Sequence, residues 1–250
     1  MSTVDFDRTL EPFFFGELFG VWRAPKNIAR VWVVCPPFAE EEKSARRTLV
    51  TLCDALAERG DASLVFSLRG TGDSGGDFRE ATLTNWQNDV RAACDEARRR
   101  APDAELCLCG LRLGAGLGQS IVAEVQATRC VWIEPVFEGR AVLQEIKQKK
   151  RLRAMMTKNE GGGDALPDDD FDGWPITESL RASLEGFLSA PNPEISSLII
   201  GVGPRAELST PHARWAEEAN AQKLALKMPA FWNRLDTVSA QPLLETIPQW

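Results

Sequence analysis

The sequence predicts an α/β fold with a mostly parallel central sheet and helices on both faces. Short apolar runs of strand length alternate with helical patterns along most of the 250 residues. Several of these runs are continuous and rich in β-branched residues, which is typical of strands buried on both faces. Alternation of this kind implies βαβ units with right-handed crossovers. We therefore expect a single layered domain over residues 1–250.

Six strands are expected in the centre of the chain. They cover residues 29–37, 62–70, 105–111, 129–136, 195–203 and 224–231. The first reads ARVWVVCPP, and its two prolines mark the end of the strand because proline cannot donate to a ladder. An aromatic run, PFFFGELFG at 12–20, is expected to form an opening strand or hairpin of the same sheet.

Four helices are expected between these strands, at residues 44–60, 83–102, 114–125 and 210–222. The first carries leucines at helical spacing and has Gly60 as its C-terminal stop. The helix at 114–125 is small and apolar, which indicates burial. For the last helix we expect a capping threonine, Thr210, followed by a proline in the first turn.

The alternation breaks between about residues 140 and 190, where we expect a small helical cap inserted over the sheet. A basic helix is predicted at 144–156. The glycine-rich, acidic stretch KNEGGGDALPDDDFDGWP then predicts a mobile loop, and another short helix follows. Charge runs of this kind are usually solvated faces, although the basic helix is also a candidate for docking a protein partner or anionic lipid.

Composition excludes several classes of function. The net charge of −7 argues against nucleic-acid binding, which normally requires a basic face. The six cysteines form no CxxC pair, so neither a metal site nor a cofactor is predicted. No apolar run approaches the ~20 residues that span a bilayer, and the first residues do not resemble a secretory signal. We expect a cytoplasmic protein with reduced thiols.

The pentapeptide GDSGG places Ser74 in the context of the nucleophile of chymotrypsin-like proteases. Those proteases are all-β and have their histidine before the serine, whereas here the only histidine, His212, follows it. The longer segment LRGTGDSGGDF fits another pattern, the RGxGxS loop at the active-site rim of α/β-hydrolases. We therefore expect Ser74 to be structural, with the glycines allowing a tight reversal at positive φ.

In an α/β-hydrolase the nucleophile belongs on the next strand-to-helix turn, in the form G-x-S-x-G. The chain has this turn as Gly110-Leu111-Arg112-Leu113-Gly114, with an arginine at the centre. A guanidinium cannot attack a carbonyl carbon, because it stays protonated and offers no lone pair. Acyl-enzyme chemistry at this elbow is excluded.

The other triad positions are also altered. The loop after the last strand has Phe231 and Trp232 but no histidine. His212 follows the preceding strand, where the acid is usual, and Glu207 is the nearest carboxylate. His212 is expected to be a surface or capping residue in the first turn of a helix. Ser74, Glu207 and His212 remain candidates only for a displaced catalytic site.

Several segments together resemble one family, the exosortase-A-associated α/β-hydrolase-like proteins, in the second of their two hydrolase types. They are VVCPPFAEEEKSARR, LRGTGDSGGDF, GLRLGA, VWIEPVFEGRAVLQEI, FDGWPITESL and PAFW. The match covers nearly the whole chain. It implies an α/β-hydrolase fold, a hydrolase assigned by fold alone, and a setting among exosortase/PEP-CTERM sorting and exopolysaccharide functions. It also implies that arginine at the elbow is a family trait.

The elbow faces the carboxyl edge of the sheet at a helix N-terminus, which favours anions. Two outcomes stay open: Arg112 binds a carboxylate or phosphate, or it is tied by Glu40, Glu41 or Glu134. The segment PPFAEEEK lies on the loop that normally forms the oxyanion hole, which makes Phe38, Glu40 and Glu41 candidates for the same site. A non-catalytic binding or scaffolding role is favoured, with an esterase or thioesterase using displaced residues as the alternative.

Overall fold

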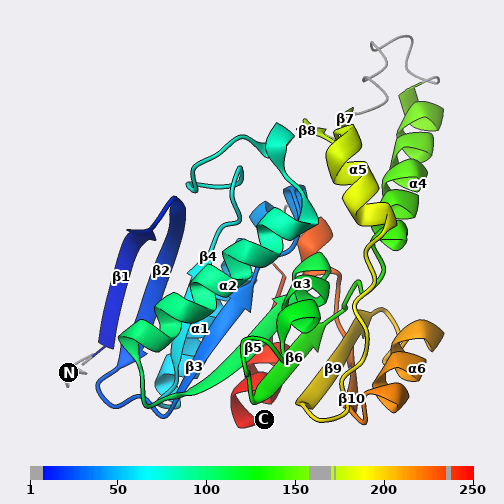
Figure 1. Cartoon of the computed structure of the whole chain (residues 1–250). Coiled ribbons are helices and arrows are strands. Elements are labelled where there is room, and N and C mark those ends of the chain that lie inside the picture. Colours follow the sequence, from blue (N-terminus) through cyan, green and yellow to red (C-terminus); the bar gives the residue numbers. More distant parts are fainter. Residues whose placement is uncertain (1–7, 158–169, 172, 235–237) are drawn as a thin grey trace, which may run out of the picture.

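The computed structural model describes residues 8–157, 170–171, 173–234 and 238–250. Within this part of the chain, an eight-stranded sheet runs through the centre in the order β1-β2-β4-β3-β5-β6-β9-β10 (Figure 1). All pairs from β4 to β10 are parallel. The hairpin β1–β2 joins β4 in antiparallel orientation at one edge. The parallel strands therefore end at one common edge, where ligands usually bind in sheets of this kind.

The strands of this sheet have the following bounds: β1 Arg8–Phe15, β2 Leu18–Pro25, β3 Arg30–Cys35, β4 Ala62–Phe66, β5 Glu105–Leu111, β6 Arg129–Ile133, β9 Ser196–Gly203 and β10 Gln222–Lys227. All six predicted central strands and the predicted opening hairpin are present. The observed strands mostly end earlier than predicted. In the second predicted strand, for example, the chain leaves the sheet after Phe66 and enters the glycine-rich loop.

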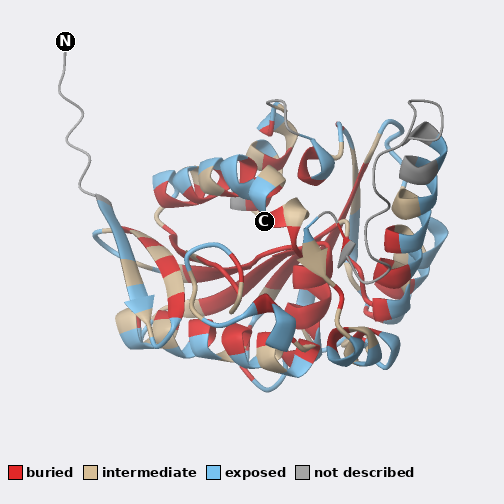
Figure 2. Ribbon diagram, turned by 90° about the horizontal axis from the view of Figure 1, so that it is seen from above, coloured by how far each residue is buried: buried red, intermediate tan, exposed pale blue. Residues whose placement is uncertain are grey.

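Helices cover both faces of the sheet. The first face is covered by α1 Glu40–Glu58 and α7 Gln241–Thr246. The second face is covered by α2 Leu83–Arg100, α3 Leu113–Ile121 and α6 Thr210–Glu218. Figure 2 shows the buried strands between these two layers, whose outward surfaces are exposed. Three 3-10 turns complete this part: η1 Phe78–Glu80, η2 Phe231–Asn233 and η3 Ile247–Gln249.

The first turns of α1 and α6 differ from the prediction, and the basic helix predicted at 144–156 begins earlier, at Gly139. Helix α1 begins at Glu40 and not near residue 44, since three acidic residues occupy its first turn and complement the positive end of the helix dipole. Helix α6 is capped by Ser209 and not by Thr210: the Ser209 side chain accepts a hydrogen bond from the backbone N–H of His212. Thr210 and Pro211 lie inside the first turn.

The predicted insertion lies between β6 and β9. It contains α4 Gly139–Thr157, the short strands β7 Asp170–Phe171 and β8 Trp174–Pro175, and α5 Glu178–Glu185. Helices α4 and α5 stand side by side beyond the carboxyl edge of the sheet (Figure 1). They pack closely, because a Cβ on Gly139 would lie 2.2 Å from the carbonyl oxygen of Leu184. The predicted mobile loop lies largely outside the described residues.

All six cysteines are free and buried, and a buried thiol packs as a small apolar side chain. Burial raises the pKa of the Cys53 thiol to about 11 and that of Cys94 to about 12. These thiols are therefore unreactive near neutrality. Across the described residues, none of the helices combines the length and the apolar character needed to cross a bilayer.

A glycine substitution tests the packing at the start of α3. In Gly114→Ala, the new Cβ would lie 2.2 Å from the carbonyl oxygen of Pro36. We expect this variant to lose about 1–3 kcal/mol of unfolding free energy, the usual cost of overpacking. Chemical denaturation measures it.

The matched control is Gly186→Ala at the end of α5, where the nearest atom to an added Cβ is 3.8 Å away. This variant should unfold at nearly the parent denaturant concentration. Equal stability of the two variants would contradict the close approach at Gly114.

Candidate functional site

Arg112 is the single residue between β5 and α3, and its backbone is strained. It has φ 55° and ψ −122°, a conformation that long side chains rarely adopt. Two hydrogen bonds hold the turn from the neighbouring β6 segment. The Arg112 N–H donates to the carbonyl oxygen of Ile133 at 3.0 Å, and its own carbonyl oxygen accepts from the Val136 N–H at 3.0 Å. The predicted elbow is therefore present without a nucleophile on it.

The two flanking glycines are required by close backbone approach. A Cβ on Gly110 would lie 2.4 Å from the Cα of Ala115, and one on Gly114 would contact the carbonyl oxygens of Cys35 and Pro36. The elbow is thus fixed by contacts between β5, α3 and the loop after β3. These contacts do not depend on the side chain at position 112.

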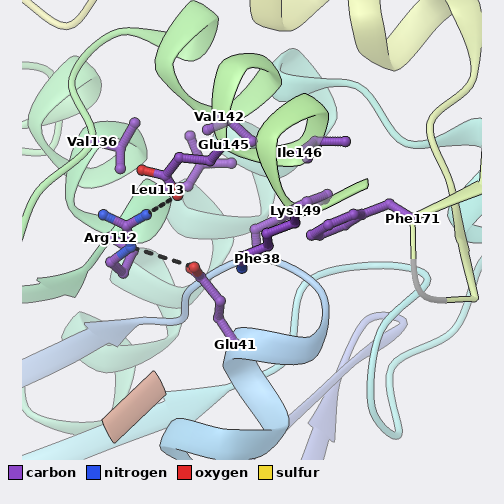
Figure 3. A pocket seen from close by; sticks show the side chains of 10 residues that line it. All are labelled: Phe38, Glu41, Arg112, Leu113, Val136, Val142, Glu145, Ile146, Lys149 and Phe171. Atoms are coloured by element: carbon purple, nitrogen blue, oxygen red, sulfur yellow. Dashed lines mark hydrogen bonds and ion pairs between the residues drawn. The ribbon is translucent and has the colours of Figure 1, made fainter. Parts of the chain in front are cut away.

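The Arg112 side chain lies between two carboxylates (Figure 3). Its Nε lies 3.4 Å from Oε1 of Glu41, and its Nη2 donates a hydrogen bond to Oε2 of Glu145. The guanidinium carbon also lies 5.6 Å from the ring centre of Trp232, within the range of a cation–π interaction. Of the three carboxylates considered for Arg112 from the sequence, Glu41 is the one that forms an ion pair with it.

Burial and charge act in opposite directions on this pair. Burial lowers the pKa of Arg112, but the nearby Glu41 and Glu145 carboxylates outweigh it and place that pKa above its ordinary value. Burial raises the pKa of the Glu41 carboxyl, and the Arg112 charge offsets only part of this effect. Removing one partner of such a buried pair typically costs about 3–5 kcal/mol, because the other charge is left uncompensated.

The two carboxylates differ in their exposure. The Glu41 side chain is 12% exposed and comes from the first turn of α1, which packs on the sheet. The Glu145 side chain is 41% exposed and comes from α4, in the inserted segment. Glu41 is consequently an internal partner of Arg112, whereas Glu145 reaches the same guanidinium from the solvent side.

A cavity of about 20 Å³ adjoins Arg112, enough for about one water molecule. Helix α4 fills most of the space above the elbow with four of the lining side chains, Val142, Glu145, Ile146 and Lys149. The Lys149 ammonium donates a hydrogen bond to Oδ1 of Asn233 at 3.3 Å and lies 5.4 Å from the Phe171 ring centre. The site is therefore closed by the inserted segment in this structure.

Aromatic rings hold this closure on the side opposite Glu145. The ring of Phe38 is parallel to that of Phe171 at 6.4 Å, and it also contacts Trp86 at 5.7 Å. Phe78 packs edge-on against Trp174 at 4.7 Å. Phe38 thus lines the cavity as expected, and Phe171 and Trp174 attach the β7–β8 hairpin to the loops at the carboxyl edge.

The Ser74 hydroxyl joins the glycine-rich loop to the neighbouring strands. Its Oγ donates to the carbonyl oxygen of Ser67 at 2.7 Å and accepts from the N–H of Phe19 at 2.9 Å. Its one hydroxyl proton is thus used in tying the loop to the strands. The same loop contains Gly70, Gly72 and Gly76 at positive φ, as the tight reversal requires.

His212 lies in the first turn of α6, as expected, but its side chain is half-buried and makes specific contacts. Its Nε2 lies 2.7 Å from the carbonyl oxygen of Pro135, and its Nδ1 lies 3.9 Å from Oε1 of Glu134. Oε2 of Glu134 accepts a hydrogen bond from the Val202 N–H at 2.7 Å. These contacts join α6 to the ends of β6 and β9. They involve neither Ser74 nor the exposed Glu207.

Glu40, the other acidic candidate, points elsewhere. Its carboxylate pairs with Lys43 at 3.4 Å, and its side chain is 40% exposed.

The sequence did not identify Glu145 or Lys149 as members of the site. The available signal was their spacing: Val142, Glu145 and Lys149 are three and four residues apart, which places them on one helix face.

Metal ligation finds no support in the described part of the chain. No group of three or more histidine, cysteine or acidic side chains is placed there to hold an ion. The carboxylates that do converge, Glu41 and Glu145, are matched by the guanidinium of Arg112.

Comparison of the sequence with known proteins finds no matching family model and no matching curated protein. The fold, in contrast, matches many solved structures. An α/β serine hydrolase without a lid from Xanthomonas campestris is 17% identical, with a TM-score of 0.60, over 97% of this chain and 93% of its own. Est1E from Butyrivibrio proteoclasticus, solved with ferulic acid bound, is 16% identical with a TM-score of 0.68 and 96% of each chain covered.

A third similar structure is the bottromycin epimerase BotH, solved with bottromycin A2. It is 19% identical, with a TM-score of 0.61, and the match covers 97% of this chain and 98% of that one. Identities this low show a common architecture and no more. Together with the strand order and the elbow, these likenesses show that the chain has the α/β-hydrolase fold.

Proposed function

We propose that this protein is a non-hydrolytic member of the α/β-hydrolase fold that binds an anionic small molecule through Arg112. The observation that carries the proposal is the guanidinium itself, which stands at the position of the nucleophile and is paired with two carboxylates. An arginine cannot act as a nucleophile, but it can donate several hydrogen bonds, so it is suited to binding a ligand. Carboxylate and phosphate groups are the ligands that best match its planar geometry.

Charge balance indicates how such a ligand enters. Arg112 and Lys149 supply two positive charges to the closed site, and Glu41 and Glu145 supply two negative ones. If the Glu145 side chain moves into solvent, one positive charge is left without its partner. An anionic ligand then restores neutrality, so Glu145 acts as an internal substitute for the ligand.

The exposure of the two carboxylates supports this division of roles. Glu145 is the more exposed partner and leaves Arg112 with less loss of packing than the buried Glu41. Glu41 would stay in place and orient the guanidinium. Phe38 and Phe171 would provide apolar contacts for the part of the ligand next to its charged group.

A likeness to hydrolases does not by itself imply hydrolysis. One of the similar structures is described as an epimerase.

The resemblance of the sequence segments supports a cytoplasmic role in exosortase-associated export, as a binding or scaffolding protein. Native mass spectrometry of the protein purified from its own host would identify a retained ligand or partner, and a species without either would argue against that setting.

The binding proposal is tested with Glu145→Gln. Because the amide no longer competes as a charge, inorganic phosphate or butyrate should bind about tenfold more tightly than to the parent. Isothermal titration calorimetry measures both affinities.

Arg112→Lys is the matched variant, since it keeps the positive charge but loses the planar fork. It should bind both anions more weakly than the parent. Exposed Glu207→Gln serves as the control and should leave the affinity unchanged. Identical heats for the parent, Glu145→Gln and Arg112→Lys would rule out anion binding at this site.

Hydrolysis is tested separately with p-nitrophenyl acetate and p-nitrophenyl butyrate. We expect release of p-nitrophenol at the buffer rate, because the elbow has no nucleophile and the Ser74 proton is already donated to Ser67. Turnover that persists in Arg112→Lys and disappears in Ser74→Ala would establish the alternative, an esterase with displaced residues.

A further inference from the structure

A second cavity lies on the other side of the first turn of α1, between that helix and the face of the sheet formed by β2 and β4. Its volume is about 90 Å³, several times that of the space beside Arg112. Its walls are mainly apolar and include Val21, Leu49, Val50 and Val65. Neither Arg112 nor any residue of α4 lines it, so it is a separate site.

Strand β2 forms one wall because of its alternation. Phe19, Val21 and Arg23 are half-buried and share the face toward α1, whereas the residues between them are buried against the opposite helix layer. Val21 is paired with Val65 of β4, which continues the same wall. On the other side, Leu49 and Val50 of α1 line the space.

Arg23 lines the cavity, and its guanidinium carries a buried donor that has no acceptor in the described part of the chain. Its Nε donates to Oδ1 of Asp54 at 3.1 Å, and the Arg23 side chain is 11% exposed. Its Nη1 is fully buried and has no hydrogen-bond partner among the described residues. A buried guanidinium N–H without an acceptor is unfavourable and unusual in a folded protein.

The other polar groups at the cavity are already paired. Ser67 donates to Oε1 of Glu42 at 2.7 Å, and the Arg46 guanidinium lies 3.7 Å from the same oxygen. The unmet donor is therefore at the Arg23 end, where an incoming acceptor would find a positively charged partner. A charged oxygen makes the strongest bond with such a donor.

The β1–β2 hairpin lies at the edge of the sheet next to the strands that line the cavity (Figure 1). Leu10 is paired with Arg23, and Phe14 with Phe19, so these residues share one face of the hairpin. Leu10 and Phe14 are each 63% exposed. A hydrocarbon chain longer than the cavity would find an apolar path along this face.

We propose that this cavity binds a short- or medium-chain carboxylate, with the carboxylate at Arg23 and the chain against the valine and leucine walls. The cavity is several times the volume that one water molecule needs, so it holds only the first few carbons. The remainder of a longer chain lies over the exposed hairpin face. This site is independent of the one at Arg112.

The experiment titrates the protein with hexanoate and with 1-hexanol by isothermal titration calorimetry. Hexanoate should bind at least about tenfold more tightly, the factor that one charge-assisted hydrogen bond contributes. Arg23→Gln should remove this preference, and Val50→Phe, which fills the cavity from α1, should weaken both ligands. Equal binding of the acid and the alcohol to the parent would overturn the proposal.

A control and a comparison variant separate this site from others. Arg99→Gln changes an exposed arginine on the opposite face and should leave hexanoate binding unchanged. Arg112→Lys removes the planar fork at the elbow and should leave in place the hexanoate binding that depends on Arg23. If Arg112→Lys abolishes binding, the carboxylate is at the elbow and the second site is refuted.

A measurement on the parent protein avoids any folding defect of the variants. Hexanoate should shift the amide resonances of β2 and of α1 around Val50, with smaller shifts in α3. Shifts confined to α3 and α4 would also refute the second site.

Discussion

The pairing of Arg112 with Glu41 and Glu145 joins three parts of the chain that are far apart in sequence. Arg112 is at the end of β5, Glu41 is in the first turn of α1, and Glu145 is on the inserted helix α4. The negative charges of Glu41 and Glu145 keep the guanidinium ionised although it is largely buried. The closed state of the carboxyl edge depends on this balance, because α4 contributes both a charge and the side chains that fill the space.

The strained backbone at position 112 is maintained by hydrogen bonds to the segment around the end of β6 and by the close packing of its flanking glycines. Gly110 and Gly114 bring β5 and α3 into contact with each other and with the loop after β3. In a serine hydrolase the same turn presents a nucleophile. In this protein the residue at the centre of the turn is an arginine, whose guanidinium pairs with Glu41 and Glu145.

The first turn of α1 borders both cavities. Glu41 faces the elbow, whereas its neighbour Glu42 accepts a hydrogen bond from Ser67 beside the larger cavity. Burial raises the pKa of both carboxyls above their ordinary value. Adjacent residues of one rigid helix thus hold buried charge at two separate sites, which makes this turn a structural centre of the carboxyl edge.

Local patterns determined the secondary structure and the elbow. Apolar runs set the central strands, and glycine spacing located the turn at Arg112, because these features depend on neighbouring residues. The helix starts were less certain: the cap at Ser209 and the early start at Glu40 depend on side-chain hydrogen bonds and charges near the first turn.

Only the tertiary structure decided which carboxylates pair with Arg112. Glu40, Glu41 and Glu134 were equal candidates from the sequence, and the helical rotation of α1 directs Glu41 inward and leaves Glu40 beside Lys43. Glu145 could not be assigned, since nothing in a basic helix specifies which part of the sheet it covers. The cavity at Arg23 was equally inaccessible to sequence reasoning, because a space between a helix and a strand exists only once the two have packed.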